Sequence, residues 1–150
     1  MLLRQTRPIA IFLTAVLLAS CSYIPFSGGE LEGSVAAPLD DWQAVADKDI
    51  IQLETNPQAP YSVNLWMIAE STHLYVYAGD NHADWAQHID SDENVRMKIG
   101  EVIYELAATR VLDQAEFQHF TKLWLDKYGS DRTDSLASNT YLYKLVARAS

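Results

Sequence analysis

The sequence has little cysteine, few basic residues and no long apolar run, and each shortage excludes a class of protein. Cys21 is the only cysteine among 150 residues, so no disulfide can form within the chain. The longest apolar run covers roughly residues 9–18, which is too short for a membrane-spanning helix of about 20 residues. The 11 Lys and Arg residues face 20 Asp and Glu residues, a net charge of −9. Such a surface is repelled by nucleic-acid phosphates and anionic lipid headgroups, so we expect no nucleic-acid partner.

The common catalytic and metal-binding motifs are absent as well. The chain contains no nucleophile elbow, no phosphate-binding glycine loop, no His-Glu-x-x-His run and no convincing carboxylate pair. His82 and His88 flank Trp85, but a separation of six residues places them on opposite sides of a predicted helix. The acidic residues around Asp90 lack the spacing of calcium ligands. We therefore predict no metal site, and the motifs leave the catalytic residues unknown.

The first twenty-one residues have the layout of a secretory signal. Arg4 and Arg7 precede the apolar run, no acidic residue interrupts it, and small residues stand immediately before Cys21. A buried N-terminal helix would show an apolar stripe rather than an apolar cylinder. That alternative and an ordinary cleaved signal with a free thiol remain open. All 20 acidic residues lie after this segment.

The ending Leu18-Ala-Ser-Cys21 resembles the lipobox of bacterial lipoproteins. The resemblance implies that residues 1–20 are removed and that Cys21 is diacylated and becomes the new N-terminus, which would explain a lone cysteine in a secreted chain. Ser22 after the cysteine is similar to the outer-membrane sorting signal, which implies an outer-membrane lipoprotein facing the periplasm. We expect residues 21–38, with their Gly and Pro residues, to form a flexible tether. Residues 39–150 would then form one domain.

Periodicity and turn residues divide this domain into short elements. Asp113 and Glu116 form a capping box at the start of the clearest helix, and Gly129 follows its end. Consecutive hairpins of short strands, interrupted by helices, favour a small antiparallel barrel. The fold class is therefore predicted to be mainly β (α+β). Predicted helices cover residues 39–46, 81–90 and 113–128, and predicted strands cover 50–55, 62–69, 73–78, 95–99, 101–111 and 141–147.

Three strand segments carry a family resemblance. The runs Ile51-Gln-Leu-Glu-Thr55, Val63-Asn-Leu-Trp-Met67 and Leu74-Tyr-Val-Tyr77 are similar to the start of split-barrel proteins of the pyridoxamine-phosphate oxidase-like kind. Segments 84–100 and 141–146 continue the likeness, which looks nearest to the deazaflavin-dependent nitroreductases. The resemblance implies a split β-barrel with flanking helices. It also implies a homodimer with flavin or deazaflavin in the dimer cleft, its phosphate held by a basic loop after the first strand.

The loop at residues 56–61 departs from that family pattern, because it reads Asn-Pro-Gln-Ala-Pro-Tyr and offers no Lys, Arg or Gly. Its two prolines also lack backbone N–H donors. Arg96 and Lys98 are the nearest basic candidates for a phosphate, and they share one face of a strand. An ordinary solvated outer face is the simpler explanation of that pair, ahead of phosphate binding.

Trp66, Tyr75 and Tyr77 are predicted to share the outer face of one hairpin. Cover by the C-terminal helix, a dimer surface and a platform for a flat ligand all account for aromatic residues there.

Two functional hypotheses follow. The first is a lipid-anchored, periplasm-facing binding or interaction module, homodimeric, whose cofactor site has degenerated. The alternative is an oxidoreductase, similar to nitroreductases or quinone reductases, that binds flavin or deazaflavin. Under the alternative, the cofactor contacts would be Trp66, Tyr75, Tyr77, Arg96 and Lys98.

Overall fold

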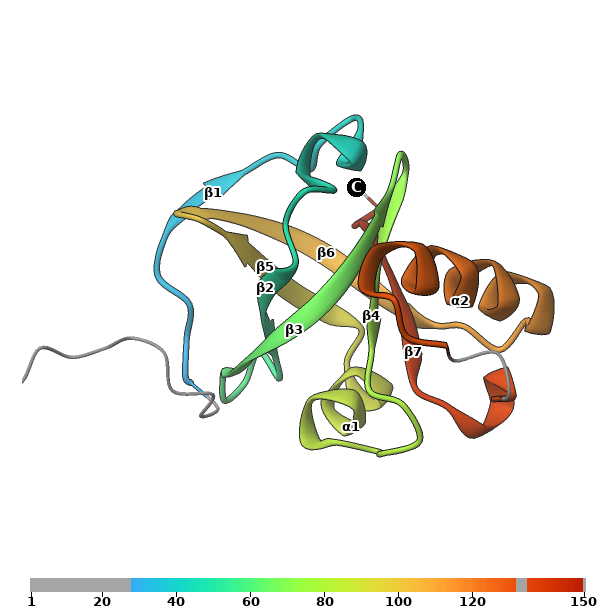
Figure 1. Ribbon diagram of the computed structural model, residues 1–150. Helices are drawn as coiled ribbons and strands as arrows, with labels where there is room; N and C mark the ends of the chain where they lie inside the picture. Colours follow the sequence, from blue (N-terminus) through green and yellow to red (C-terminus); the bar gives the residue numbers. More distant parts are fainter. Residues whose placement is uncertain (1–27, 132–134, 150) are drawn as a thin grey trace, which may run out of the picture.

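Six antiparallel strands close into a barrel in the computed structural model, which describes residues 28–131 and 135–149 (Figure 1). Around the barrel the order is β6-β5-β2-β3-β4-β7, and a pairing of β7 with β6 completes the ring. The strands of the barrel are β2 (Ile50–Thr55), β3 (Tyr61–Glu70), β4 (His73–Tyr77), β5 (Asn94–Ile99), β6 (Val102–Arg110) and β7 (Leu142–Ala147). The predicted fold class, a mainly β split barrel with flanking helices, is confirmed.

A seventh strand lies outside the ring. β1 (Ser34–Ala36) pairs in parallel with the start of β6. Gly33, just before it, approaches Glu101 so closely that a Cβ would lie 2.7 Å from the Glu101 carbonyl oxygen. Leu31 is buried, and Gly28 forms a β-bridge with Ser62. Part of the segment predicted as a flexible tether, residues 21–38, thus contacts the barrel, through the Gly28–Ser62 bridge, the buried Leu31 and β1.

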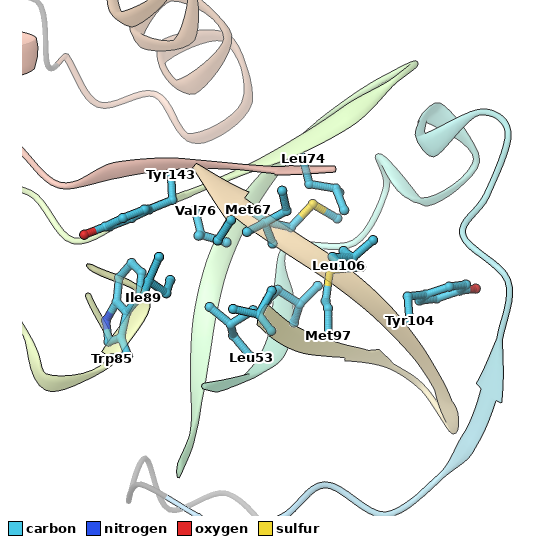
Figure 2. Close-up of a cluster of buried hydrophobic side chains, with 14 of the residues drawn as sticks. Leu53, Met67, Leu74, Val76, Trp85, Ile89, Met97, Tyr104, Leu106 and Tyr143 are labelled. Atoms are coloured by element: carbon cyan, nitrogen blue, oxygen red, sulfur yellow. The ribbon is translucent and has the colours of Figure 1, made fainter. Parts of the chain in front are cut away.

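Alternation along the strands fills the barrel with apolar side chains. Val63, Leu65 and Met67 of β3 point inward, whereas Ser62, Asn64 and Trp66 point outward. Figure 2 shows side chains of all the barrel strands converging on one cluster. The buried centre includes Leu53, Met67, Leu74, Val76, Met97, Leu106 and Tyr143.

Short helical elements lie at the two ends of the barrel (Figure 1). At one end α1 (Asp84–Ser91) inserts Trp85 and Ile89 into the cluster. At the other end a 3-10 turn, η1 (Trp42–Val45), buries Trp42, whose ring makes a T-shaped contact with the Tyr104 ring. The helix predicted at residues 39–46 is thus shorter than expected, and Asp41 caps it by accepting a hydrogen bond from the Gln43 N–H.

The longest helix, α2 (Gln114–Tyr128), packs on the outside of the barrel over β3, β4 and β7 (Figure 1). Asp113 accepts a hydrogen bond from the Glu116 N–H at 2.7 Å, and Gly129 ends the helix with φ of 69°. Phe117, Phe120 and Trp124 form a second buried cluster with Tyr75 and Ile68. On the outer face where Trp66, Tyr75 and Tyr77 were predicted, α2 therefore buries Tyr75 and leaves Trp66 half exposed.

In the described ranges no helix is long and apolar enough to cross a membrane. Cys21 and the predicted signal at residues 1–20 lie outside the described residues.

Candidate functional site

A hollow of about 430 Å³ opens on the outer surface where β3 and β4 separate. The two strands pair only from Met67 to Glu70 on β3, and the chain after Tyr77 turns away to pair with Tyr141. We call this hollow the aromatic groove. Its lining consists of Asn64, Leu65, Trp66, Tyr77, Ala78, Gly79, Asp80 and Trp124.

Trp66 is the ring that this groove presents to solvent. It stacks on Tyr128 with the ring centroids 5.1 Å apart and the planes 18° apart, and it lies 5.9 Å from the Trp124 ring. Tyr77 also contacts Trp124, with the ring centroids 5.8 Å apart. Trp66 is nevertheless 49% exposed. Trp124 and Tyr128 belong to α2, so the helix keeps the rings beside Trp66 in place. The groove therefore offers a rigid aromatic surface on which a flat molecule can stack.

The charge in the groove is negative. Asp80 is the only charged side chain among the described residues that line it, and Asn64 supplies an amide. An acid beside an exposed aromatic ring suits a neutral or cationic ligand better than an anion.

Tyr75 lies under α2 rather than in the groove. Its ring is buried against Phe120, and its hydroxyl donates a hydrogen bond to Glu116 Oε1 at 3.0 Å. Burial and this bond to Glu116 raise the pKa of Tyr75 well above its ordinary value. Of the three predicted aromatic residues, Trp66 and Tyr77 line the groove and Tyr75 is covered.

Arg96 and Lys98 were predicted to bind a phosphate. Neither reaches the groove, because both lie on β5. Arg96 Nη1 is 2.9 Å from Oε1 of the buried Glu54, and Arg96 Nη2 donates to the Leu31 carbonyl. Lys98 pairs with Glu101 at 3.3 Å. The structure therefore brings together two of the five predicted cofactor contacts and gives Arg96 an acidic partner within the chain.

A second hollow of about 350 Å³ lies beside Arg96, near the proline-containing loop after β2. Arg148 also lines it, but the carboxylates of Glu54, Asp92 and Glu105 line it too. Arg148 donates to the carbonyls of Leu106 and Val95, so its guanidinium is already engaged by the barrel.

The two histidines that flank Trp85 in the sequence have different surroundings. His82 precedes α1, stacks on Tyr141 and lies 2.8 Å from Asp90, whereas His88 contacts Thr55. Across the described part of the chain, no group of three His, Cys, Asp or Glu side chains has the arrangement of a metal site.

A polar cluster between α2 and the barrel escaped sequence reasoning. Glu116 Oε1 accepts hydrogen bonds from both Tyr75 and Lys144, and Glu70 lies within ion-pair distance of both His73 and His119. The sequence indicated only a capping role for Glu116. Asn64, Asp80 and Trp124 were also missed as groove residues, since no local pattern marks a place where two strands diverge.

Comparisons with known proteins identify the fold. No family model and no curated protein matches the sequence. A protein from Listeria innocua assigned to the pyridoxamine 5'-phosphate oxidases is similar in structure, with a TM-score of 0.56 and 13% identity, over 71% of this chain and 90% of that one.

A second similar structure comes from Bacteroides thetaiotaomicron and is assigned to 5-nitroimidazole antibiotic resistance. It has a TM-score of 0.56 and 14% identity, over 83% of this chain and 84% of that one. At such identities the likeness concerns the fold. The chain therefore has the split-barrel fold of the pyridoxamine 5'-phosphate oxidase-like proteins.

Proposed function

We propose that the chain is a lipid-anchored binding module whose aromatic groove takes a flat ring that carries no phosphate. The observation that carries this proposal is the lining itself, in which an exposed Trp66, backed by Trp124 and Tyr128, lies near Asp80. The rings offer stacking area, and the carboxylate gives a preference for a neutral or cationic ligand.

The phosphate tail of a flavin nucleotide fits this groove poorly. Phosphate binding needs charge-assisted donors or a cluster of free backbone N–H groups. The described residues of the lining include no Lys or Arg. Arg96 is held by Glu54, and the loop after β2 carries Pro57 and Pro60. We therefore assign no reaction step to a flavin nucleotide.

Two ligands with the same ring system separate the possibilities. Riboflavin is neutral, whereas flavin mononucleotide adds a phosphate to the same isoalloxazine ring. Titration of the full-length protein in detergent, followed by tryptophan fluorescence, should show riboflavin binding at least as tightly as the mononucleotide. Trp66→Ala should abolish the binding, whereas Lys98→Ala, outside the groove, should leave it unchanged. If neither compound binds at high micromolar concentration, a flavin-type ring is excluded as the ligand.

The alternative function is a flavin- or deazaflavin-dependent oxidoreductase. Its support is the fold shared with a protein assigned to the pyridoxamine 5'-phosphate oxidases and with one assigned to nitroimidazole resistance. Purified protein that carries a stoichiometric flavin absorbance, bleached by a reductant and restored by a quinone or nitro compound, would establish this function in place of the binding module.

The membrane anchor in this proposal is a diacylated Cys21 that holds the chain at the outer membrane, facing the periplasm. Its support is the lipobox-like sequence at residues 18–21. Cys21→Ser should move the exported protein from the detergent phase to the aqueous phase. An unmodified thiol at Cys21, found by mass spectrometry of the exported protein, would contradict the anchor while leaving the groove proposal intact.

A further inference from the structure

A row of alternating charges crosses the outer face of three barrel strands. Glu54 of β2 lies opposite Arg96 of β5, and Arg96 lies opposite Glu105 of β6. Arg148, which follows β7, extends the row, with its Nη1 3.8 Å from Glu105 Oε2. These four side chains line the second hollow, of about 350 Å³. Among the described residues, the linings of this hollow and of the aromatic groove do not overlap.

The barrel holds the guanidinium of Arg148 in a fixed orientation. Its Nε donates to the Leu106 carbonyl at 3.1 Å, and its Nη2 donates to the Val95 carbonyl at 3.0 Å. Nε and Nη2 form one edge of the planar group, and the edge formed by Nη1 and the second N–H of Nη2 is used by neither bond. In the described part of the chain, Glu105 is the only carboxylate within ion-pair distance of Arg148, and 3.8 Å is too long for a hydrogen bond. Two N–H donors of Arg148 therefore remain for the carboxylate of a ligand.

Asp92 lines the same hollow and is held in place as well. Its Oδ1 accepts hydrogen bonds from the Asn94 backbone N–H at 2.9 Å and from Asn94 Nδ2 at 2.8 Å. These two bonds lower the pKa of Asp92 below its ordinary value, and the charge of Arg148 acts in the same direction. Because both bonds use Oδ1, Oδ2 of an ionised Asp92 keeps its capacity to accept a hydrogen bond from a ligand.

The charges of the lining disfavour a simple ion. Two guanidinium groups and three carboxylates line the hollow, from Arg96, Arg148, Glu54, Asp92 and Glu105. Arg96 and Glu54 bind each other at 2.9 Å, so Arg148 is left with Asp92 and Glu105. An anion at Arg148 would meet the repulsion of two carboxylates, and a cation at Asp92 would meet the repulsion of a guanidinium. A molecule that carries both charges satisfies both sides of the hollow.

We propose that this hollow binds a small zwitterion of the α-amino acid class, with its carboxylate on the unused edge of Arg148 and its ammonium at Asp92 Oδ2. The volume of about 350 Å³ falls within the range of small-molecule sites. The site is independent of the aromatic groove, so the riboflavin titration and the test of this hollow can succeed or fail separately.

Three small probes test the need for both charges. L-alanine carries an ammonium and a carboxylate, propionate lacks the ammonium, and ethylamine lacks the carboxylate. Isothermal titration calorimetry of the full-length protein in detergent should show L-alanine binding at least about tenfold more tightly than either of the other two. Propionate or ethylamine binding as tightly as L-alanine would overturn the proposal, and so would the absence of saturable L-alanine binding at millimolar concentration.

Two substitutions test the two contacts separately. Arg148→Gln should reduce the affinity for L-alanine to that for ethylamine. Asp92→Asn, which keeps an acceptor for the two Asn94 bonds, should reduce the affinity for L-alanine to that for propionate. The matched control is Lys122→Gln, which also removes one positive charge but lies on the exposed surface of α2, and it should bind L-alanine as the parent does.

Circular dichroism checks that each variant is folded. Arg148 also bonds to the barrel, so Asp92→Asn, at the surface, decides the outcome if Arg148→Gln does not fold. A folded Asp92→Asn protein that binds L-alanine as tightly as the parent would refute the ammonium contact and with it the zwitterion site.

Discussion

Glu54 shows how one residue joins three parts of the chain. Its buried carboxylate, on β2, binds the Arg96 guanidinium of β5 at 2.9 and 3.1 Å and also accepts the backbone N–H of Leu31. Arg96 in turn donates to the Leu31 carbonyl. A carboxylate taken out of water needs such partners, and the partners become unsatisfied when it is removed.

We predict that Glu54→Gln lowers the free energy of unfolding by about 1–3 kcal/mol, because Arg96 loses its counter-charge. Urea denaturation followed by circular dichroism measures the change. Glu105→Gln is the control, since Glu105 is half exposed and 3.8 Å from Arg148, and it should change stability by less than about 0.5 kcal/mol. Equal losses for the two substitutions would contradict a special role for the buried pair.

His73 makes stability depend on pH. Burial lowers its pKa below the ordinary value of 6.5, although Glu70 acts in the opposite direction. The unfolded chain therefore binds a proton more readily, and the stabilisation present above pH 6.5 is lost as pH falls toward the folded-state pKa. Denaturation midpoints should decline from pH 7 to pH 5, and His73→Gln should flatten that decline. An unchanged slope in the variant would assign the pH dependence to another group.

Sequence reasoning singled out Arg96 and Lys98 but not their partners. The alternation of β5 correctly put Arg96 and Lys98 on one outer face. Nothing local showed that Glu54, 42 residues earlier, would lie opposite Arg96. Strand register and barrel closure decide which charges meet, and neither is encoded in residue spacing.

Helix α2 supports the exposed ring of the aromatic groove. Its start and end are local signals, Asp113 and Gly129, and both were predictable from the sequence. Its buried face carries Phe117, Phe120 and Trp124, which have Tyr75 and Ile68 as neighbours. Trp124 and Tyr128 at the end of the stripe support Trp66.

We predict that Phe120→Ala weakens the packing of α2 against the barrel. The ring is fully buried and contacts Tyr75 and Tyr77, so we expect a loss of about 3–5 kcal/mol in the free energy of unfolding. Leu125→Ala, on the exposed side of the same helix, should be nearly neutral. Urea denaturation of the two variants measures the difference. A small effect of Phe120→Ala would mean that α2 contributes little to the stability of the barrel.

β1 was missed because it is short and exposed. All three of its residues are exposed, and it pairs with β6 alone, so no apolar alternation marks it. Gly33, which must be small because it approaches Glu101 closely, is the main sign of β1 in the sequence. A single glycine in a glycine-rich stretch does not distinguish a strand from a linker.

At the scale of the whole molecule, charge opposes self-association. The chain carries a net charge of −9, so two copies repel each other at low ionic strength. We expect the homodimer implied by the family resemblance to form more readily as salt screens this repulsion. Sedimentation of the full-length protein in detergent at low and at moderate ionic strength should show a two-chain species that increases with salt. A monomer unaffected by salt and by protein concentration would contradict the dimer.

The Gly28–Ser62 bridge also limits how far the barrel can stand from a bilayer. Because Gly28 is already bridged to the barrel, only residues 22–27 lie between that bridge and Cys21. Six extended residues reach at most about 20 Å. If Cys21 bears acyl chains as proposed, Gly28 and the adjacent groove stay within about 20 Å of the membrane surface. A sparingly water-soluble compound could then pass from the leaflet to Trp66 without crossing bulk solvent.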